Sequence, residues 1–306
     1  MYYPYLRGKQ FELIALRELV EKSLINERII PIIEPIKVTS TFVSTLKKFV
    51  ENEKKIAVII NPGEGDIENI YKESSENTAL QDLLSSEFVS KAYLMNNNSE
   101  EEIRELEKLA FPINELLVIH KNENNLTKYK ALFGRYSPKF TFVPDSTLFR
   151  RSITNPKVLL EDRFNKLKKN SDYKDRDEFY SADHLFYSAE NYTGFSDYSI
   201  IGDEYMDGGF APYAVAIHVV YFNPEQHLWV KSFVSDSNDD IQDPARKFYE
   251  AVTHLYKWLP EDQIQTDGLQ QLIAHYNKET YPGLGTVKKL SIMHHLELMS
   301  QYLEKV

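Results

Sequence analysis

IIPIIE, at Ile29–Glu34, and KIAVIIN, at Lys55–Asn61, set the pattern of this chain. Each is a continuous apolar run that ends in a polar residue and is followed by residues at helical spacing. Apolar runs without alternation are typical of strands buried on both faces, and helices between them favour a parallel sheet. The pattern recurs at Tyr2–Leu6, Lys91–Asn96, Glu115–His120, Lys139–Asp145, Tyr198–Asp203 and Tyr213–Phe222. Eight such units predict an α/β fold, a (β/α)8-type barrel or a close variant of it.

The length of the chain favours one domain. It has 306 residues, and a barrel of this type occupies about 250 residues as a single unit. We therefore predict a single domain over residues 1–306, with an insertion or lid at 146–197 and a C-terminal helical extension at 243–306 that caps the barrel. In the eighth unit, YAVAIHVVYF, NPEQ and HLWVKSFVSD follow one another, which predicts an antiparallel hairpin at strand eight.

Composition excludes several classes of protein. The formal net charge of −10 argues against a broad surface for nucleic acid or anionic membranes, because such surfaces need clustered Lys and Arg. The chain has no cysteine, which excludes disulfides, thiolate zinc sites and a cysteine nucleophile. No apolar run reaches the ~18 residues of a membrane span, and no signal peptide is recognisable, so we expect a cytoplasmic protein.

Two blocks of sequence carry a resemblance to one family. The first is YYPYLRGKQFELIALREL followed by IIPIIEPI, and the second comprises GFSDYSIIGDEY, AVAIHVVYF, FVSDSNDD and YPGLGTVKKLSIMHHLEL. In these blocks, which span nearly the whole chain, it resembles the beta-protein family, named for a phage protein, and its bacterial relatives. The resemblance implies a bacterial or phage accessory gene whose product acts with a neighbouring gene product in conflict between phage and host. It implies no particular reaction.

In a β/α barrel the functional residues lie at the carboxyl ends of the strands. The candidate catalytic residues at these ends are Glu34, His120, Asp145 and Asp203, and the candidate residues for an anionic ligand are Arg7, Lys9, Lys37, Asn61 and His218. The step Arg7-Gly8-Lys9 precedes an expected helix, where side-chain charge, backbone N–H groups and the helix dipole could hold a phosphate or carboxylate. The alternative is a solvated turn whose cations pair with Glu34 or with neighbouring acids.

Three of these carboxylates, Glu34, Asp145 and Asp203, share one end of the barrel in this strand assignment. Converging carboxylates could bind Mg²⁺, Mn²⁺ or Ca²⁺, or could divide the roles of general acid and general base. The alternative is that each carboxylate pairs with a cation and only fixes geometry. The cations available for such pairs are Arg7, Lys37, Lys121 and Arg150.

The histidines allow similar alternatives. His120 ends the fifth run, where it could act as a general acid, a general base or a ligand. His218 lies within AVAIHVVYF, and a histidine in an apolar run is more often a hydrogen-bonded core residue than a functional one. His294 and His295 are adjacent on an expected helix, so they face about 100° apart and cannot both serve one site.

Two functions fit these features. The first is binding or turnover of a phosphorylated or otherwise anionic small molecule at the carboxyl-terminal face of the barrel, with Mg²⁺ or Mn²⁺ as the metal if one is used. A hydrolase of the phosphodiesterase type is one form of it, although those enzymes place a histidine directly before the Arg-Gly step and this chain has Leu6. The second is a non-catalytic protein that binds a partner encoded nearby, or a second copy of itself, through the Tyr-rich segment Tyr173–Tyr198.

Overall fold

The computed structural model describes residues 1–74, 77–134, 137–206, 212–259 and 265–306. The contacts among them group into two compact units, whereas the length of the chain led us to expect one domain. The first unit comprises residues 1–9, 29–162 and 183–197, and the second comprises residues 10–28, 163–182 and 198–306. Each unit is described by itself below.

The first unit is a barrel of eight parallel strands in the order β1-β2-β3-β4-β5-β6-β7-β9. The strands are β1 (Tyr5–Leu6), β2 (Ile32–Ile33), β3 (Ile56–Ile59), β4 (Val89–Leu94), β5 (Leu117–Ile119), β6 (Phe140–Val143), β7 (Lys157–Glu161) and β9 (Gly194–Asp197). Tyr2 forms parallel bridges with Ile29 and with Phe195, so the first and last strands meet and the barrel nearly closes. The predicted (β/α)8-type fold is confirmed.

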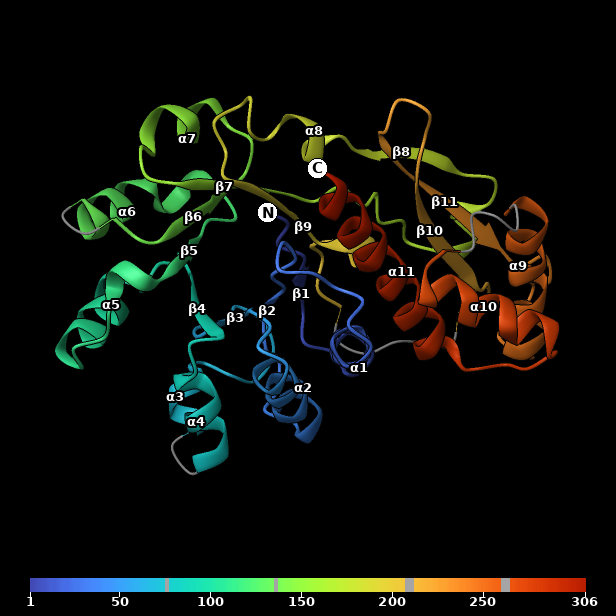
Figure 1. The fold of residues 1–306 in the computed structure, drawn as a ribbon, viewed down its shortest axis with the longest axis horizontal. Coiled ribbons are helices and arrows are strands. Elements are labelled where there is room, and N and C mark those ends of the chain that lie inside the picture. Colours follow the sequence, from blue (N-terminus) through green and yellow to red (C-terminus); the bar gives the residue numbers. More distant parts are fainter. Residues whose placement is uncertain (75–76, 135–136, 207–211, 260–264) are drawn as a thin grey trace. The chain divides into compact units, whose positions relative to one another are not determined.

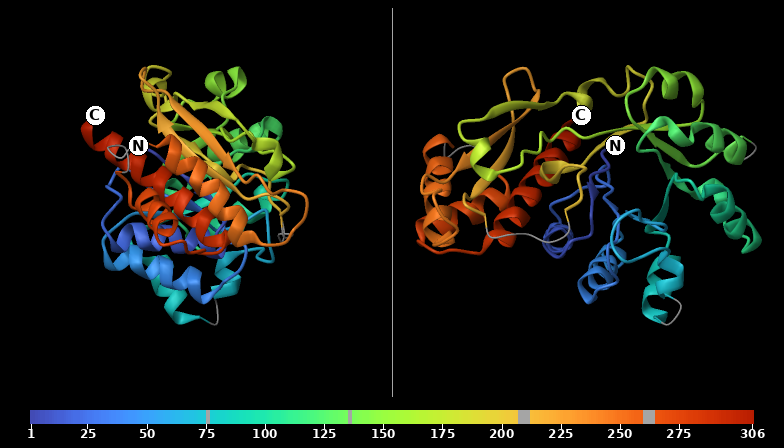
Figure 2. Two further views of the ribbon diagram at one scale, coloured as in Figure 1. Left: turned by 90° about the vertical axis from the view of Figure 1, so that its right-hand side faces the viewer. Right: turned by 180° about the vertical axis from the view of Figure 1, so that it is seen from behind.

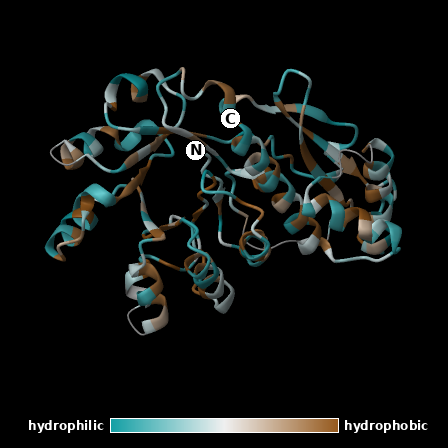
Figure 3. Ribbon diagram, viewed as in Figure 1, coloured by the Kyte–Doolittle hydropathy of each residue, from teal (hydrophilic) through white to brown (hydrophobic). Residues whose placement is uncertain are grey.

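The helices of the first unit connect successive strands and lie on their outer side (Figure 1). They are α2 (Ser40–Glu51), α3 (Ile70–Ser74), α4 (Thr78–Ser85), α5 (Ser99–Lys108), α6 (Leu126–Phe133), α7 (Thr147–Ser152) and α8 (Asp183–Phe186), with the 3-10 turns η1 (Ile113–Glu115) and η2 (Glu123–Asn125). In α2, Thr39 caps the first turn by accepting the N–H of Phe42 at 3.1 Å, and the same helix buries Phe42, Leu46 and Phe49. Figure 3 shows α5 as mostly hydrophilic, in agreement with a helix that covers the sheet with a narrow apolar stripe.

Strands seven and eight of the barrel differ from the sequence prediction. The run Tyr198–Asp203 forms only the 3-10 turn η4 (Ser199–Ile201), and the run Tyr213–Phe222 contributes to a separate sheet. The seventh and eighth barrel strands are β7 and β9 instead, so the segment 146–197, predicted as an insertion or lid, supplies two strands of the barrel.

The composition of β9 explains why the pattern of apolar runs does not predict this strand. A Cβ atom on Gly194 would lie 2.8 Å from the carbonyl oxygen of Met1, so the closing seam has no room for a side chain there. Ser196, two positions on, donates from Oγ to the carbonyl oxygen of Tyr3 at 2.6 Å. A strand that must approach the first strand this closely therefore lacks the apolar run by which the other strands were recognised.

The second unit is built on a three-stranded antiparallel sheet in the order β10-β11-β8. Its strands are β8 (Asp177–Ser181), β10 (Ala216–Phe222) and β11 (Leu228–Val234), and its helices are α1 (Gln10–Glu21), α9 (Pro244–Trp258), α10 (Asp267–Asn277) and α11 (Leu284–Lys305), with the turn η3 (Asn170–Tyr173). The predicted hairpin is present as β10 and β11, but it belongs to this sheet and not to the barrel. The predicted helices of residues 243–306 are present as α9 to α11.

Helix α11 is the centre of the second unit. It packs against α1, α10 and β10 (Figure 2). A Cβ atom on Gly285 would lie 2.0 Å from the ring of Phe11, and one on Gly268 would lie 2.4 Å from the carbonyl oxygen of Leu290. Both glycines are therefore required for the close approach of α11 to its neighbours. None of the helices among the described residues has the length and apolar composition needed to cross a membrane.

Candidate functional site

The strand register decides which strand-end side chains point into the barrel. Laterally paired residues of neighbouring strands share a face, and successive residues of one strand alternate between faces. The pairing of β1 with β2 therefore puts Tyr5, Arg7 and Glu34 on one face. Tyr3, which shares that face, packs edge-on against Phe142 of β6 with ring centroids 5.1 Å apart. Because Tyr3 and Phe142 meet across the barrel, this face is the interior.

Glu34 is the centre of the polar cluster at the carboxyl end of the barrel. It is fully buried, and both of its carboxylate oxygens accept hydrogen bonds. Oε1 accepts the backbone N–H of Gly63 at 2.8 Å, and Oε2 accepts the hydroxyl of Tyr5 at 2.7 Å and the Nη1 group of Arg7. We refer to Tyr5, Arg7, Glu34 and Gly63 as the Glu34 cluster. Within it the carboxylate charge is compensated by one cation and two further donors.

Arg7 is held from two sides. Its side chain forms the ion pair with Glu34, and its guanidinium carbon lies 5.4 Å from the centroid of the Tyr5 ring, within the range of a cation–π contact. Only 3% of Arg7 is exposed. Gly8 follows with φ at +66°, and a Cβ there would lie 3.1 Å from the carbonyl oxygen of Glu34, so the turn after Arg7 favours glycine. The guanidinium is therefore fixed in position at the end of β1.

The side chain of Asn61, which follows β3, forms hydrogen bonds that extend the sheet. Its Nδ2 donates to the carbonyl oxygen of Leu94 at 2.9 Å, and its Oδ1 accepts the N–H of Leu94 at 2.8 Å. Nδ2 also lies 3.0 Å from Glu102 Oε2, which accepts the hydroxyl of Tyr93 at 2.7 Å. The amide thus takes the place of a backbone group on the β3–β4 ladder, and this explains its burial without a ligand.

His120 points away from the interior. It follows Ile119 by one position, and the alternation of faces puts it outside, where it packs against Tyr129 of α6 and Phe149 of α7 with centroids 5.0 Å away in each case. Burial lowers the pKa of His120 to about 4, so the ring is neutral at pH 7. Neither ring nitrogen has a hydrogen-bond partner among the described residues. His120 therefore does not point into the barrel interior, where the predicted catalytic residues would lie.

The remaining predicted carboxylates do not join Glu34. Asp145 is half-exposed and pairs with Arg150 of α7, and its backbone N–H donates to Glu161. Asp203 follows η4 in the second unit and does not end a barrel strand. No group of three or more His, Asp or Glu side chains among the described residues is arranged to hold a metal ion. For Glu34 and Asp145 the structure has the ion-pair alternative, and the predicted metal set of Glu34, Asp145 and Asp203 is not assembled.

The other predicted ligand residues are dispersed. Lys37 is largely exposed and lies 3.1 Å from Asp66, and Lys9 is half-buried at the end of the first segment of the barrel unit. His218 belongs to β10 of the second unit, where its Nδ1 lies 2.9 Å from Ser232 Oγ and burial lowers its pKa to about 4. His218 is thus a part-buried residue whose ring is hydrogen-bonded within this sheet, close to the alternative interpretation of the sequence.

Three residues of the barrel unit make polar contacts that the pattern of strand-end residues does not predict. Tyr5 is hidden in the first apolar run, and Gly63 contributes only a backbone N–H. Asp197 ends β9, where it accepts the hydroxyl of Tyr2 at 2.8 Å, and burial together with this carboxylate raises the pKa of Tyr2. A search for polar residues directly after apolar runs finds Arg7 and Glu34, but it cannot find donors inside a run or at the end of a strand that lacks one.

Comparisons of the chain with protein-family models, with curated proteins and with solved structures found no match. The geometry of the barrel end therefore carries the functional interpretation by itself.

Proposed function

We propose that this β/α-barrel protein binds a small anionic molecule, such as a phosphorylated metabolite, at the carboxyl-terminal end of its barrel, with Arg7 as the residue that supplies positive charge. The observation that carries the proposal is the fixed, buried guanidinium of Arg7 at the end of β1, held by Glu34 and by the ring of Tyr5. An arginine offers several N–H donors in a planar array that matches carboxylate and phosphate groups. In β/α barrels this end of the strands is where ligands bind.

The roles of the neighbours favour binding over hydrolysis. Glu34 accepts three hydrogen bonds, so in this proposal it orients Arg7 and does not act as a general base. Asp145 is engaged by Arg150, and His120 faces the helices. General acid–base catalysis needs a group within hydrogen-bond reach of the substrate. A divalent metal and a phosphodiesterase reaction therefore form no part of the proposal.

Calorimetric titration with inorganic phosphate and with a nucleoside monophosphate tests it. The first variant is Arg7→Lys, which keeps the charge beside Glu34 but removes the planar set of donors. We expect its affinity to fall by about 1.5–3 kcal/mol, roughly ten- to a hundredfold, which is the scale of a charge-assisted hydrogen bond. The matched control is Arg150→Lys, because Arg150 also pairs with a strand-end carboxylate but is half-exposed.

Two results would count against this function. One is the failure of the wild-type protein to bind either anion, and the other is an unchanged affinity in Arg7→Lys. A second variant, Arg7→Met with Glu34→Met, removes both charges together, so that no uncompensated charge is left to unfold the protein. It should bind neither anion while keeping its circular dichroism spectrum.

A second candidate function is binding of a protein partner through the sheet of the second unit. Phe179, on the outermost strand β8, is 52% exposed and meets Trp229 edge-on with centroids 6.4 Å apart. The buried Nε1 group of Trp229 has no hydrogen-bond partner among the described residues, so an acceptor from outside would satisfy it. Exposed aromatic residues of this kind are typical anchors at interfaces.

In this second proposal the partner is a neighbouring gene product or a second copy of the chain. The same proposal includes membership of the beta-protein family and a role in conflict between phage and host. Sedimentation velocity of the protein alone, and of the protein expressed together with its neighbour, should show an assembly that Phe179→Ser dissociates. An assembly that survives this substitution would place the interface elsewhere.

A further inference from the structure

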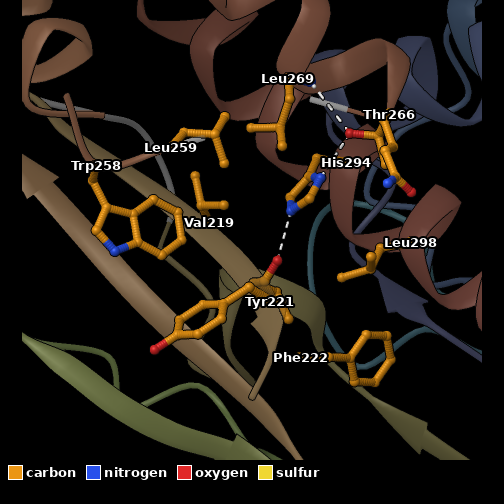
Figure 4. A pocket seen from close by; sticks show the side chains of 11 residues that line it. Val219, Tyr221, Phe222, Trp258, Leu259, Thr266, Leu269, His294 and Leu298 are labelled. Carbon is orange, nitrogen blue, oxygen red and sulfur yellow. Dashed lines mark hydrogen bonds between the residues drawn. The ribbon is translucent and has the colours of Figure 1, made fainter. Parts of the chain in front are cut away.

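A pocket in the second unit is independent of the barrel. It has a volume of about 180 Å³ and lies between strand β10 and helices α9, α10 and α11. Figure 4 shows Leu259, Leu269, His294 and Leu298 around it, with Val219 at its base and Trp258 at one side. The residues that line it all belong to one unit. The described part of its wall thus comes from one unit.

The inner wall of the pocket contains a chain of hydrogen bonds that engages His294 and Thr266. His294 Nε2 lies 2.6 Å from the carbonyl oxygen of Val220, which can only accept, so this nitrogen carries the proton. Burial lowers the pKa of His294 to about 4, so the ring is neutral at pH 7 and its Nδ1 accepts the hydroxyl of Thr266 at 2.8 Å. Thr266 Oγ1 in turn accepts the N–H of Leu269 and caps α10. We refer to this set as the His294 chain.

The rim is aromatic and held in place from behind. Trp258 packs against Tyr221 and Phe233 with ring centroids 5.1 and 5.3 Å away, and the ammonium group of Lys231 lies 5.8 Å from its ring. Phe222, at the lower edge in Figure 4, is supported by Tyr302 at 4.9 Å. Because these rings are fixed by their neighbours, little conformational freedom remains to be lost when a ligand binds.

The lining sets the chemistry of the ligand. Among the described residues that line the pocket there is no Asp, Glu, Lys or Arg, and the one histidine is neutral. A charged ligand would find no oppositely charged partner among these described residues. The volume exceeds the ~150 Å³ of an apolar cavity known to hold benzene, and it falls short of the roughly 300 Å³ of pockets for larger ligands. We propose that this pocket binds a neutral molecule with a single aromatic ring.

Fluorescence of Trp258 gives a direct test with benzene as the probe. The chain has two tryptophans, so Trp229→Phe leaves Trp258 as the only reporter. We expect saturable changes in emission with benzene and at least about tenfold weaker binding of benzoate, a difference of 1.4 kcal/mol or more. Leu298→Phe, which fills the pocket from its half-buried rim, should weaken benzene binding by a similar factor, whereas Leu109→Phe, on an exposed residue of the barrel unit, should not.

A second measurement does not depend on a folded variant. Nuclear Overhauser effects from benzene protons should reach the methyl groups of Leu259 and Leu269 in the wild-type protein. Absence of these effects, benzoate binding as tight as that of benzene, or full benzene affinity in a folded Leu298→Phe protein would overturn the proposal. Arg7→Lys should leave benzene binding unchanged, which separates this pocket from the proposed anion site.

Discussion

The two units each contain a buried polar centre, and the two centres are stabilised in different ways. The Glu34 cluster joins a carboxylate to a guanidinium and adds the Tyr5 hydroxyl and a backbone N–H. The His294 chain contains no charge, and each of its members passes a hydrogen bond to the next. Both centres are almost inaccessible to solvent. The difference teaches what each can tolerate, because a buried charge that loses its partner costs far more than a neutral group that loses one hydrogen bond.

The difference also bears on function. The proposed anion site relies on the charged guanidinium of the Glu34 cluster, whose stability depends on every member. The proposed pocket adjoins a neutral chain whose hydrogen bonds are made between its own members. The two proposals therefore differ in the charge of the buried centre that each one uses.

The largest expected effect is on the Glu34 cluster. Glu34→Ala leaves the buried Arg7 guanidinium without its carboxylate and should lower the free energy of unfolding by about 3–5 kcal/mol. Urea denaturation at pH 7 measures it. The matched control is Asp145→Ala, which breaks an ion pair whose members are 44% and 43% exposed and should cost about 1 kcal/mol or less. Equal losses in the two variants would mean that the Arg7–Glu34 pair is solvated.

The next effect concerns a single neutral donor to that charge. Tyr5→Phe removes the hydroxyl that donates to Glu34 and should cost about 1.5–3 kcal/mol, the usual range for a hydrogen bond to a charged group. Tyr3→Phe is the control in the same barrel, because burial alone raises the pKa of Tyr3 to about 12 and no bonded partner contributes. The free energies of unfolding are compared through the urea midpoints of the two variants, measured at equal m-values. A loss in Tyr3→Phe as large as in Tyr5→Phe would assign the effect to packing.

The His294 chain predicts a dependence of stability on pH. The folded pKa of His294 is about 4 and its ordinary value is 6.5, so the unfolded chain binds the proton more readily and stability falls as the pH drops from 6.5 towards 4. Between pH 6.5 and 5 this amounts to about 1.6 kcal/mol, because the slope rises from half of its limit of ~1.4 kcal/mol per pH unit at pH 6.5 to nearly all of it at pH 5. The difference in unfolding free energy between pH 6.5 and 5 should be smaller by that amount in His294→Gln. Parallel pH profiles of the two proteins would refute the neutral, buried state.

The smallest effect is at the other end of the same chain. Thr266→Val removes the cap of α10 and the donor to His294 and should cost about 1 kcal/mol, the typical value for an N-cap. Thr266→Ser keeps the oxygen and serves as the control. Thermal unfolding of the two variants side by side gives the difference. A loss above that of Tyr5→Phe would reverse the ranking of the two centres.

The sequence was sufficient for the first six strands of the barrel and for the position of Arg7 and Glu34. Their apolar runs end where the strands end, and the polar residue that follows marks the carboxyl end of each strand. Strand β9 was missed because Gly194 and Ser196 satisfy the seam and not an apolar pattern. The run Tyr213–Phe222 has a stronger strand signal than β9, but nothing in its composition says which sheet it will join.

The second feature that the sequence does not predict is the direction in which each strand-end side chain points. In a run that is apolar throughout, no alternation reveals which residues face the interior, and a shift of one position exchanges the two faces. Arg7 and Glu34 fall on the inner face, whereas His120 falls on the outer one. Only the register between strands, which follows from pairing across the whole barrel, separates these cases.

The seam of the barrel has a consequence for the order in which the protein forms. Ser196 bonds to Tyr3 across 193 positions of sequence, and contacts so distant are formed late because a long loop has to close first. On the ribosome the edge of the first strand that faces β9 stays unpaired until β9 has emerged. Helix α1 lacks its packing partner for longer still, because that partner, α11, is the last helix of the described chain. Residues 10–28 and 163–182 of the second unit interrupt the barrel in sequence, so neither unit is synthesised as one uninterrupted fragment. Both units are therefore incomplete, and open to chaperones, at the same stage of synthesis.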